Sequence, residues 1–148
     1  MIMDRQIAPS TAQAVTVTAF STDVIDLAVA NRDLGRSEPL RAISTVDTAF
    51  TAAGAGTLLV ELVESANADL SSPTVLFAAN GGTPFALAAL VPGGNRLMDI
   101  KIPTTTKRYL GFRYTVATGP MTAGAVSSSI VMDTPSPIAT RPYGVTGY

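Results

Sequence analysis

Two pairs of acidic residues have a spacing that could serve acid–base chemistry: Asp23 with Asp26, and Glu61 with Glu64. A glycoside hydrolase needs two carboxyl groups that flank one bond, one as the acid and the other as base or nucleophile. On a β-strand, residues three apart point to opposite faces, so neither pair converges locally. We therefore interpret these residues as solvated carboxylates.

The residue types that carry most enzyme chemistry are missing from the chain. The sequence has no histidine, no cysteine and no tryptophan. This removes the commonest general base, the commonest metal ligands and the strongest platform for stacking. We expect a protein that is not an enzyme and that has no cofactor and no metal site.

One polar stretch could bind a hard cation. Glu64, Asn67 and Asp69 offer oxygen ligands of the kind that calcium prefers, but they lack the fuller acidic spacing of a dedicated loop. Asn, Asp and Ser favour turns because their side chains hydrogen-bond the local backbone. We predict a polar turn here.

Two further motifs have a chemical and a structural interpretation. Gly54-Ala55-Gly56 resembles the start of a dinucleotide fingerprint, but Leu59 stands where the third glycine belongs and no helix follows. Lys107-Arg108 with Tyr109 is a small basic and aromatic cluster that could contact a ligand. The structural interpretation is the start of a strand whose long side chains reach out to solvent.

The composition favours one folded domain that works through its surface. A chain of 148 residues can bury a substantial core without disulfides. Charged residues make up 14% of the sequence, well below the usual quarter, so Ser, Thr, Ala and Gly must form much of the surface. The formal net charge of -1 gives no long-range attraction to phosphate backbones or anionic lipid. We expect neither nucleic acid nor a membrane as a partner.

No targeting segment is expected from the sequence. The first residues lack the basic region and apolar run of a secretory signal, and Asp4 stands where such a signal would disfavour it. The longest apolar stretch, Pro84 to Val91, is far shorter than the roughly 20 residues of a membrane-spanning helix.

The elements that must position these residues are short strands. Helical periodicity is almost absent, and β-branched and apolar runs recur about every ten residues between Gly, Pro, Asn and Asp clusters, as in a sandwich or barrel. We predict an all-β antiparallel sandwich of eight or nine strands: Ala14 to Phe20, Val24 to Val29, Leu40 to Val46, Thr57 to Val63, Thr74 to Ala78, Phe85 to Val91, Arg96 to Ile102, Arg108 to Ala117 and Ala125 to Met132.

Alternation within two of these strands predicts one buried and one solvated face. In the strand from Arg108 to Ala117 and in that from Arg96 to Ile102, we expect these residues to face the core: Leu110, Phe112, Tyr114, Val116, Met98, Ile100 and Ile102. Within Phe85 to Val91, the helix formers at 86–90 are bracketed by Gly and Pro, which favours a strand or a single turn over a helix.

A weak internal repeat suggests a symmetric arrangement. The stretch 45–55 resembles 115–125 at an offset of about seventy residues, each with a Thr-Val pair followed by a run of Thr, Ala and Gly. We hypothesise two equivalent hairpins, one in each half of a double-layered roll, with chance similarity in a biased composition as the alternative.

The two ends of the chain differ from its middle. Residues 133–148 contain Pro135, Pro137 and Pro142 with two glycines and two tyrosines, which prevents both helix and central strand. We predict an amino-terminal arm at 1–13, a domain at 14–132 and an extended carboxy-terminal arm at 133–148. Disorder is one outcome for such arms, and docking on a partner through aromatic anchors is the other.

The chain as a whole resembles the small capsid cement proteins of tailed bacteriophages, the family typified by the cement protein of a Bordetella phage. The blocks that carry the resemblance lie between Asp4 and about Met132. They are Asp4-Arg5-Gln6, Ala12 to Thr16, Ser21 to Leu27, Val46 to Gly54, Leu70 to Leu76, Arg108 to Leu110 and Tyr114 to Pro120.

The resemblance implies a jelly-roll subunit on the outside of an icosahedral shell. Such a subunit is made in the host cytoplasm, binds the major capsid protein, bridges neighbouring copies and forms a dimer or trimer on the capsid. We predict capsid or self-association contacts in the two arms, at Ile2, Asp4, Arg5, Gln6, Ile138, Arg141, Tyr143 and Tyr148.

Two alternatives come from other functional classes. A carbohydrate-binding jelly roll on the virion surface would use Tyr109 and the tail tyrosines as a stacking platform, although the chain has no tryptophan. A hydrolase that depends on carboxylates alone is the other alternative.

Overall fold

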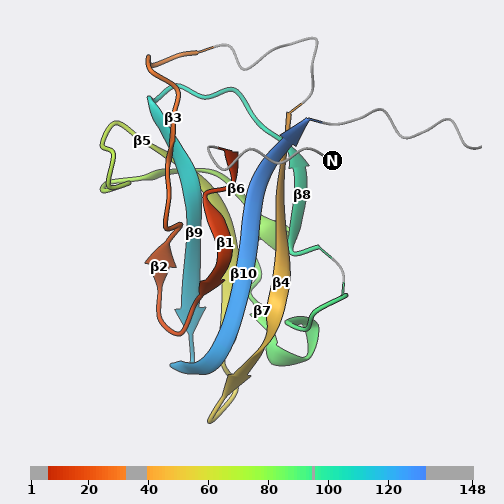
Figure 1. Ribbon diagram of the computed structural model, residues 1–148. Helices are drawn as coiled ribbons and strands as arrows, with labels where there is room; N and C mark the ends of the chain where they lie inside the picture. The colour runs from red at the N-terminus through yellow and green to blue at the C-terminus, as the bar shows by residue number, and fades with distance from the viewer. Residues whose placement is uncertain (1–6, 33–39, 95, 133–148) are drawn as a thin grey trace, which may run out of the picture.

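The computed structural model describes residues 7–32, 40–94 and 96–132, and over these residues the chain is built from β-strands and two short 3-10 helices (Figure 1). All strand pairs are antiparallel. Two sheets pack face to face, and the core lies between them. The all-β prediction is confirmed.

Four strands form the first sheet, which we call sheet A. Their order across the sheet is β1 (Ser10–Ala14), β10 (Met121–Met132), β4 (Leu40–Ala52) and β8 (Met98–Lys101). The long pair β4 and β10 is its centre, with Val126 opposite Val46 and Ile130 opposite Ala42. These four residues are buried, because alternate side chains along both strands face the core.

The second sheet, sheet B, has β9 and β5 at its centre. Its order is β2 (Ala19–Phe20), β9 (Tyr109–Ala117), β5 (Thr57–Ser65) and β6 (Thr74–Ala78), with β3 (Ile25–Asp26) also on β9 and β7 (Phe85–Ala86) also on β5. Strands β6 and β7 are separated by the 3-10 helix η2 (Ala79–Gly82), and η3 (Leu87–Ala89) follows β7.

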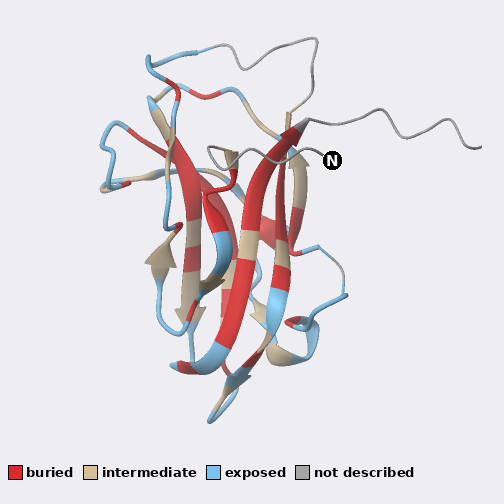
Figure 2. Ribbon diagram, viewed as in Figure 1, coloured by how far each residue is buried: buried red, intermediate tan, exposed pale blue. Residues whose placement is uncertain are grey.

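The predicted inward face of β9 is confirmed. Leu110, Phe112 and Tyr114 are fully buried, and Val116 is half-buried and packs against the core. They lie beside Leu58, Val60 and Leu62 of the neighbouring strand β5, and together these residues face the inward side of sheet A (Figure 2). Met98 of β8 is also buried, and Ile100 and Ile102 pack against the same core.

One predicted strand, Ala14 to Phe20, is wrong. Residues 15–18 connect β1 in sheet A with β2 in sheet B instead of continuing a strand. The Val15 amide donates to Gly124 O at 3.0 Å, and Thr16 O accepts from the Met121 amide at 2.9 Å. A β-branched run therefore bends over the end of the core, where Val15 is fully buried.

Other strands begin or end at residues that differ from the predicted ranges. Strand β4 continues to Ala52, β10 begins at Met121, and β3 keeps only Ile25–Asp26. The predicted strand Phe85 to Val91 becomes two strand residues and the single turn of η3. The described residues contain ten strands in place of eight or nine, because the positions beside β9 and β5 are each filled by two short strands.

The repeat hypothesis of two equivalent hairpins is wrong. The connection after β4 leads from sheet A to sheet B, and the connection before β10 leads back, so both are arches between sheets. The arches lie side by side: Ala52 is opposite Met121, and Thr51 Oγ1 lies 2.7 Å from Thr122 Oγ1.

Strand β1 begins at Ser10, so it includes the last residues of the predicted amino-terminal arm. Residues 1–6 and all of 133–148 lie outside the described residues. The extended conformation of the two arms therefore remains a prediction.

Candidate functional site

The residues predicted as capsid or self-association contacts all lie outside the described residues: Ile2, Asp4, Arg5, Gln6, Ile138, Arg141, Tyr143 and Tyr148. The other candidates lie on the sandwich, mostly at the end from which the described chain begins and ends (Figure 1).

The two glutamates of β5 lie on opposite faces of sheet B, as predicted. Glu61 lies on the outward face beside Arg113, whose Nε donates to Glu61 Oε2 at 2.7 Å. Glu64 shares the inward face with Leu58, Val60 and Leu62, at the end of the core. The two carboxyl groups therefore cannot act on one substrate bond.

Glu64 is buried, and its carboxylate oxygens accept hydrogen bonds from the connection between β8 and β9. The amide of Thr106 donates to Oε2 at 2.7 Å, the amide of Lys107 donates to the same oxygen at 3.1 Å, and the Thr106 hydroxyl donates to Oε1 at 2.7 Å. Burial alone would raise the pKa of Glu64, but these hydrogen bonds lower it below its usual value. Glu64 is thus a structural anchor. The prediction of a solvated carboxylate is wrong for Glu64 and also for Glu61, which are 2% and 6% exposed.

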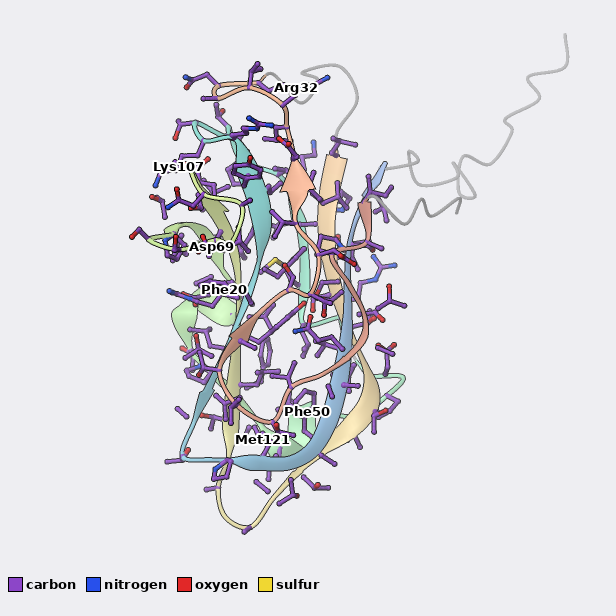
Figure 3. The ribbon with its side chains drawn as sticks, turned by 60° about the vertical axis from the view of Figure 1, so that its left-hand side comes forward. Phe20, Arg32, Phe50, Asp69, Lys107 and Met121 are labelled. Carbon is purple, nitrogen blue, oxygen red and sulfur yellow. The ribbon has the colours of Figure 1, made fainter. Side chains whose placement is uncertain are left out.

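The connection between β8 and β9, which Glu64 anchors, is hydrogen-bonded to the segment that follows β3. Thr106 O accepts from the Asn31 amide at 3.3 Å, and Arg108 O accepts from the Leu27 amide at 2.9 Å. The guanidinium of Arg32 in turn donates to Leu27 O at 2.8 Å. Segments 27–32 and 103–108 therefore form one hydrogen-bonded end of the sandwich, where Figure 3 shows Arg32 and Lys107.

Asp26 and Arg108 form an exposed ion pair at this end. Arg108 Nε and Nη2 donate to the two carboxylate oxygens of Asp26, each at 2.7 Å. The hydrogen bonds from Arg108 lower the pKa of Asp26 to about 2. The same guanidinium lies over the Tyr109 ring, 5.1 Å from its centroid. The cluster at 107–109 is the start of β9, as predicted, and one face of Tyr109 is covered.

The polar stretch after β5 is a turn, which confirms the structural interpretation. The Ser71 amide donates to Asp69 Oδ1 at 2.9 Å, and Asn67 Nδ2 donates to Ser71 Oγ at 2.9 Å. The turn presses Leu70, which is fully buried, onto the outward face of β9 at Gly111. The Glu64 carboxylate accepts hydrogen bonds from Thr106 and Lys107 instead, so the three residues considered as calcium ligands do not converge.

A row of hydroxyls crosses the core between the sheets. Tyr114 Oη lies 2.7 Å from both Ser10 Oγ and Ser128 Oγ, and Ser128 Oγ lies 2.8 Å from Ser44 Oγ. Burial raises the pKa of Tyr114 to about 12, so the phenol stays protonated and can donate. These groups satisfy one another and have a structural role.

Two features are absent from the described part of the chain. Within residues 7–32, 40–94 and 96–132, no three side chains of His, Cys, Asp or Glu gather to hold a metal ion. No helix in these ranges is long and apolar enough to cross a membrane.

A family model described as Bbp16 matches residues 9–130. The match begins one residue before β1 and ends two residues before the end of β10, so it covers all of the sandwich except the last two residues of β10. The chain belongs to the Bbp16 family. This family is named after a protein of a Bordetella phage, which agrees with the phage origin that the resemblance implied. No curated protein matches the chain.

In this Bbp16-family chain, one surface was missed by the sequence analysis. It is the end of the sandwich where Phe50 and Met121 lie, opposite Arg32 and Lys107 (Figure 3). The segments 15–19 and 85–94 reach this end (Figure 1) and contain the exposed Val17 and Val91. A signal for it exists in the sequence, because residues 48–60, 70–95 and 114–132 contain no charged residue. Only the fold shows that parts of these runs meet at one end.

Proposed function

We propose that this chain is a capsid cement protein of a tailed phage. It binds the outer surface of the icosahedral shell, bridges neighbouring major capsid proteins and stabilises them, without catalytic activity. The single observation that carries the proposal is the Bbp16 family match over residues 9–130. Its location is then the outside of the virion, and the protein is made in the host cytoplasm.

The strand order supports a jelly roll, which the proposal includes. If β3 is counted with β2 and β7 with β6, each sheet has four positions: β1-β10-β4-β8 and β2-β9-β5-β6. Successive positions alternate between the sheets except at β5 and β6. The double-sheet jelly roll of many capsid proteins also has eight strands in two sheets, so this order supports the proposed jelly roll.

The position of the described chain ends supports bridging by the arms. Residues 7 and 132 both lie at the end of the sandwich where Arg32 and Lys107 lie (Figure 1). Arms that start at one end can reach the same neighbouring subunits. A second contact made by a tethered arm is intramolecular, so each contact can be weak while the whole binds firmly. An extended arm can also add a strand to a sheet edge of its partner.

Co-sedimentation of the purified full chain with empty shells tests the proposal. We expect binding that is weakened when residues 1–6 or 134–148 are deleted. The amino-terminal deletion stops at residue 6 because Ser10 belongs to β1 and contacts Tyr114.

Point variants distinguish the loss of a specific side-chain contact with the shell from a general effect of shortening the chain. Tyr143→Ala and Tyr148→Ala should lower the fraction bound, whereas Tyr109→Ala on the domain serves as the matched control. Retention on a glycan array without any shell binding would favour the carbohydrate-binding alternative and overturn the cement proposal.

A further inference from the structure

The outward face of sheet A has two buried apolar residues that do not belong to the core. Ile43 of β4 and Val131 of β10 are 8% and 6% exposed. Their neighbours in the sequence, Ala42 and Ile130, belong to the core between the sheets, so Ile43 and Val131 point to the other side. One face of an antiparallel sheet is commonly solvated. Two buried apolar side chains on that face imply that something covers them.

The cover is local to one end of the sheet, where Figure 2 shows β10 as buried. Two residues farther from this end, on the same face, Thr45 and Ser127 lie opposite each other and are half-buried. Asp47, two residues beyond Thr45, is exposed. We call the buried residues on this face the outer patch: Ile43, Ser129 and Val131.

The described chain begins beside the outer patch. Strand β1 is antiparallel to β10, and Ser10 is opposite Ser128. The residues before Ser10 therefore run alongside the residues after Ser128, toward Val131. Ala8 is buried and Ile7 packs against the core, so the chain lies close to the sandwich at this end.

We propose that residues 1–6 cross the outward face of sheet A and cover the outer patch in the free subunit. The path from β1 over β10 to β4 takes about 10 Å, since neighbouring strands lie about 4.8 Å apart. Six extended residues span roughly 20 Å, so the length suffices. The segment starts with Met1, Ile2 and Met3. Apolar side chains of this kind gain free energy when they cover Ile43 and Val131.

The two other long segments outside the described residues fit the outer patch less well. Residues 133–148 start where β10 ends, so a return to Val131 requires a reversal of direction. Their first large apolar side chain is Ile138, which follows two prolines. Residues 33–39 are tied at both ends to described segments and contain a single large apolar residue, Leu34.

The docked segment has a consequence for the shell that rests on the proposed function. Residues 1–6 then have a fixed place on the domain before the shell is met, so they lose less conformational freedom on binding. Their outward side becomes part of the surface that the shell contacts.

A disulfide between introduced cysteines tests the position directly, because the chain has no cysteine of its own. Ile2→Cys with Val131→Cys should form an intramolecular disulfide under mild oxidation, since such a bond needs Cα atoms within about 7 Å. Mass spectrometry of the digested, unreduced protein identifies the linked peptides. Two control pairs should give little linked protein: Ile2→Cys with Val29→Cys, an exposed valine, and Ile138→Cys with Val131→Cys.

Urea denaturation tests whether the contact stabilises the folded chain. Ile2→Asp should lower the urea midpoint, whereas Ile138→Asp, the same change in the other terminal segment, should leave it unchanged. Ile2→Asp should lower the midpoint less in a Val131→Ala background, because the effects of residues in contact are not additive.

The inference is overturned if Ile2→Cys and Ile138→Cys link to Val131→Cys equally well, or if the disulfide joins two chains instead of one. An unchanged urea midpoint in Ile2→Asp would also overturn it, and would assign the cover of the outer patch to neighbouring side chains such as the Arg41–Asp99 ion pair. These measurements need no shell, so a failure of the cement proposal is seen separately in co-sedimentation.

Discussion

Glu64 shows how one residue determines the structure of one end of the molecule. Its carboxylate is almost completely excluded from solvent and accepts three hydrogen bonds from Thr106 and Lys107. A buried carboxylate is tolerated only when its oxygens are satisfied, so these bonds and the buried position depend on each other.

Replacing Glu64 tests this dependence. Glu64→Gln keeps the shape but removes the charge and turns part of the acceptor into a donor that faces the backbone amides. We expect a loss of about 2 kcal/mol in the free energy of unfolding, measured by urea denaturation. Asp69→Asn, the same change on an exposed turn, should cost clearly less; equal losses would contradict the anchoring role.

The acid dependence of stability follows from lowered carboxyl pKa values. Hydrogen bonding lowers the pKa of Glu64 from its ordinary 4.5, and Arg41 and Arg96 lower that of Asp99 against the effect of burial. The unfolded chain therefore binds protons at a higher pH than the folded chain, and stability is lost as the pH falls.

We expect full stability above about pH 5 and a progressive loss toward about pH 2. Thermal unfolding followed by circular dichroism across this range measures it. Glu64→Gln should show a shallower pH dependence than the wild type, because its titrating group is gone. An unchanged slope would assign the acid sensitivity to other carboxylates.

At the scale of elements, the turn after β5 covers the outward face of β9. A Cβ placed on Gly111 would lie 2.5 Å from Leu70 Cδ1 and 3.0 Å from Ser21 Oγ. The turn and the strand can therefore pack this closely only because residue 111 has no side chain. Sheet B is thus covered on part of its outward face, where simple alternation would predict contact with solvent.

Gly111→Ala should destabilise the fold by about 1 to 3 kcal/mol through overpacking, as measured by urea denaturation. Gly54→Ala is the matched control, because nothing lies within 4 Å of its Cβ position. In a double-mutant cycle, Leu70→Ala should reduce the cost of Gly111→Ala, since the two residues are in contact. Additive effects would contradict this packing.

At the scale of the whole molecule, the hydroxyl row links the two sheets. Tyr114 of sheet B reaches Ser10 and Ser128 of sheet A across the core. Fully satisfied polar groups in a core restrict how the layers can pack, because any shift would leave one of them without a partner. The row therefore favours one alignment of the sheets.

Tyr114→Phe removes one oxygen and leaves two buried serine hydroxyls short of a partner. We expect a loss of about 1 to 3 kcal/mol in the free energy of unfolding, whereas Tyr109→Phe at the start of the same strand should stay within about 0.5 kcal/mol. Similar losses in both variants would show that the row contributes little.

The fold class was predictable because strand periodicity is local. The alternation in Arg108 to Ala117 predicts the buried face of β9, and Leu110, Phe112 and Tyr114 occupy it. The glutamate spacing on β5 also predicts correctly that Glu61 and Glu64 lie on opposite faces. The family resemblance pointed to a phage protein, in agreement with the Bbp16 match.

Tertiary structure decided the arches between the sheets, the burial of Glu64 and the charge-free end of the sandwich. The run at 15–18 has the residues of a strand and is a connection between sheets, because hydrogen bonds to Gly124 and Met121 hold it there. Glu64 becomes buried only because a connection more than 40 residues later donates to it. Likewise, charge-free runs far apart in the chain form one surface only after the sheets pack. Local periodicity determines which residues face a core, but only long-range contacts determine which segments meet.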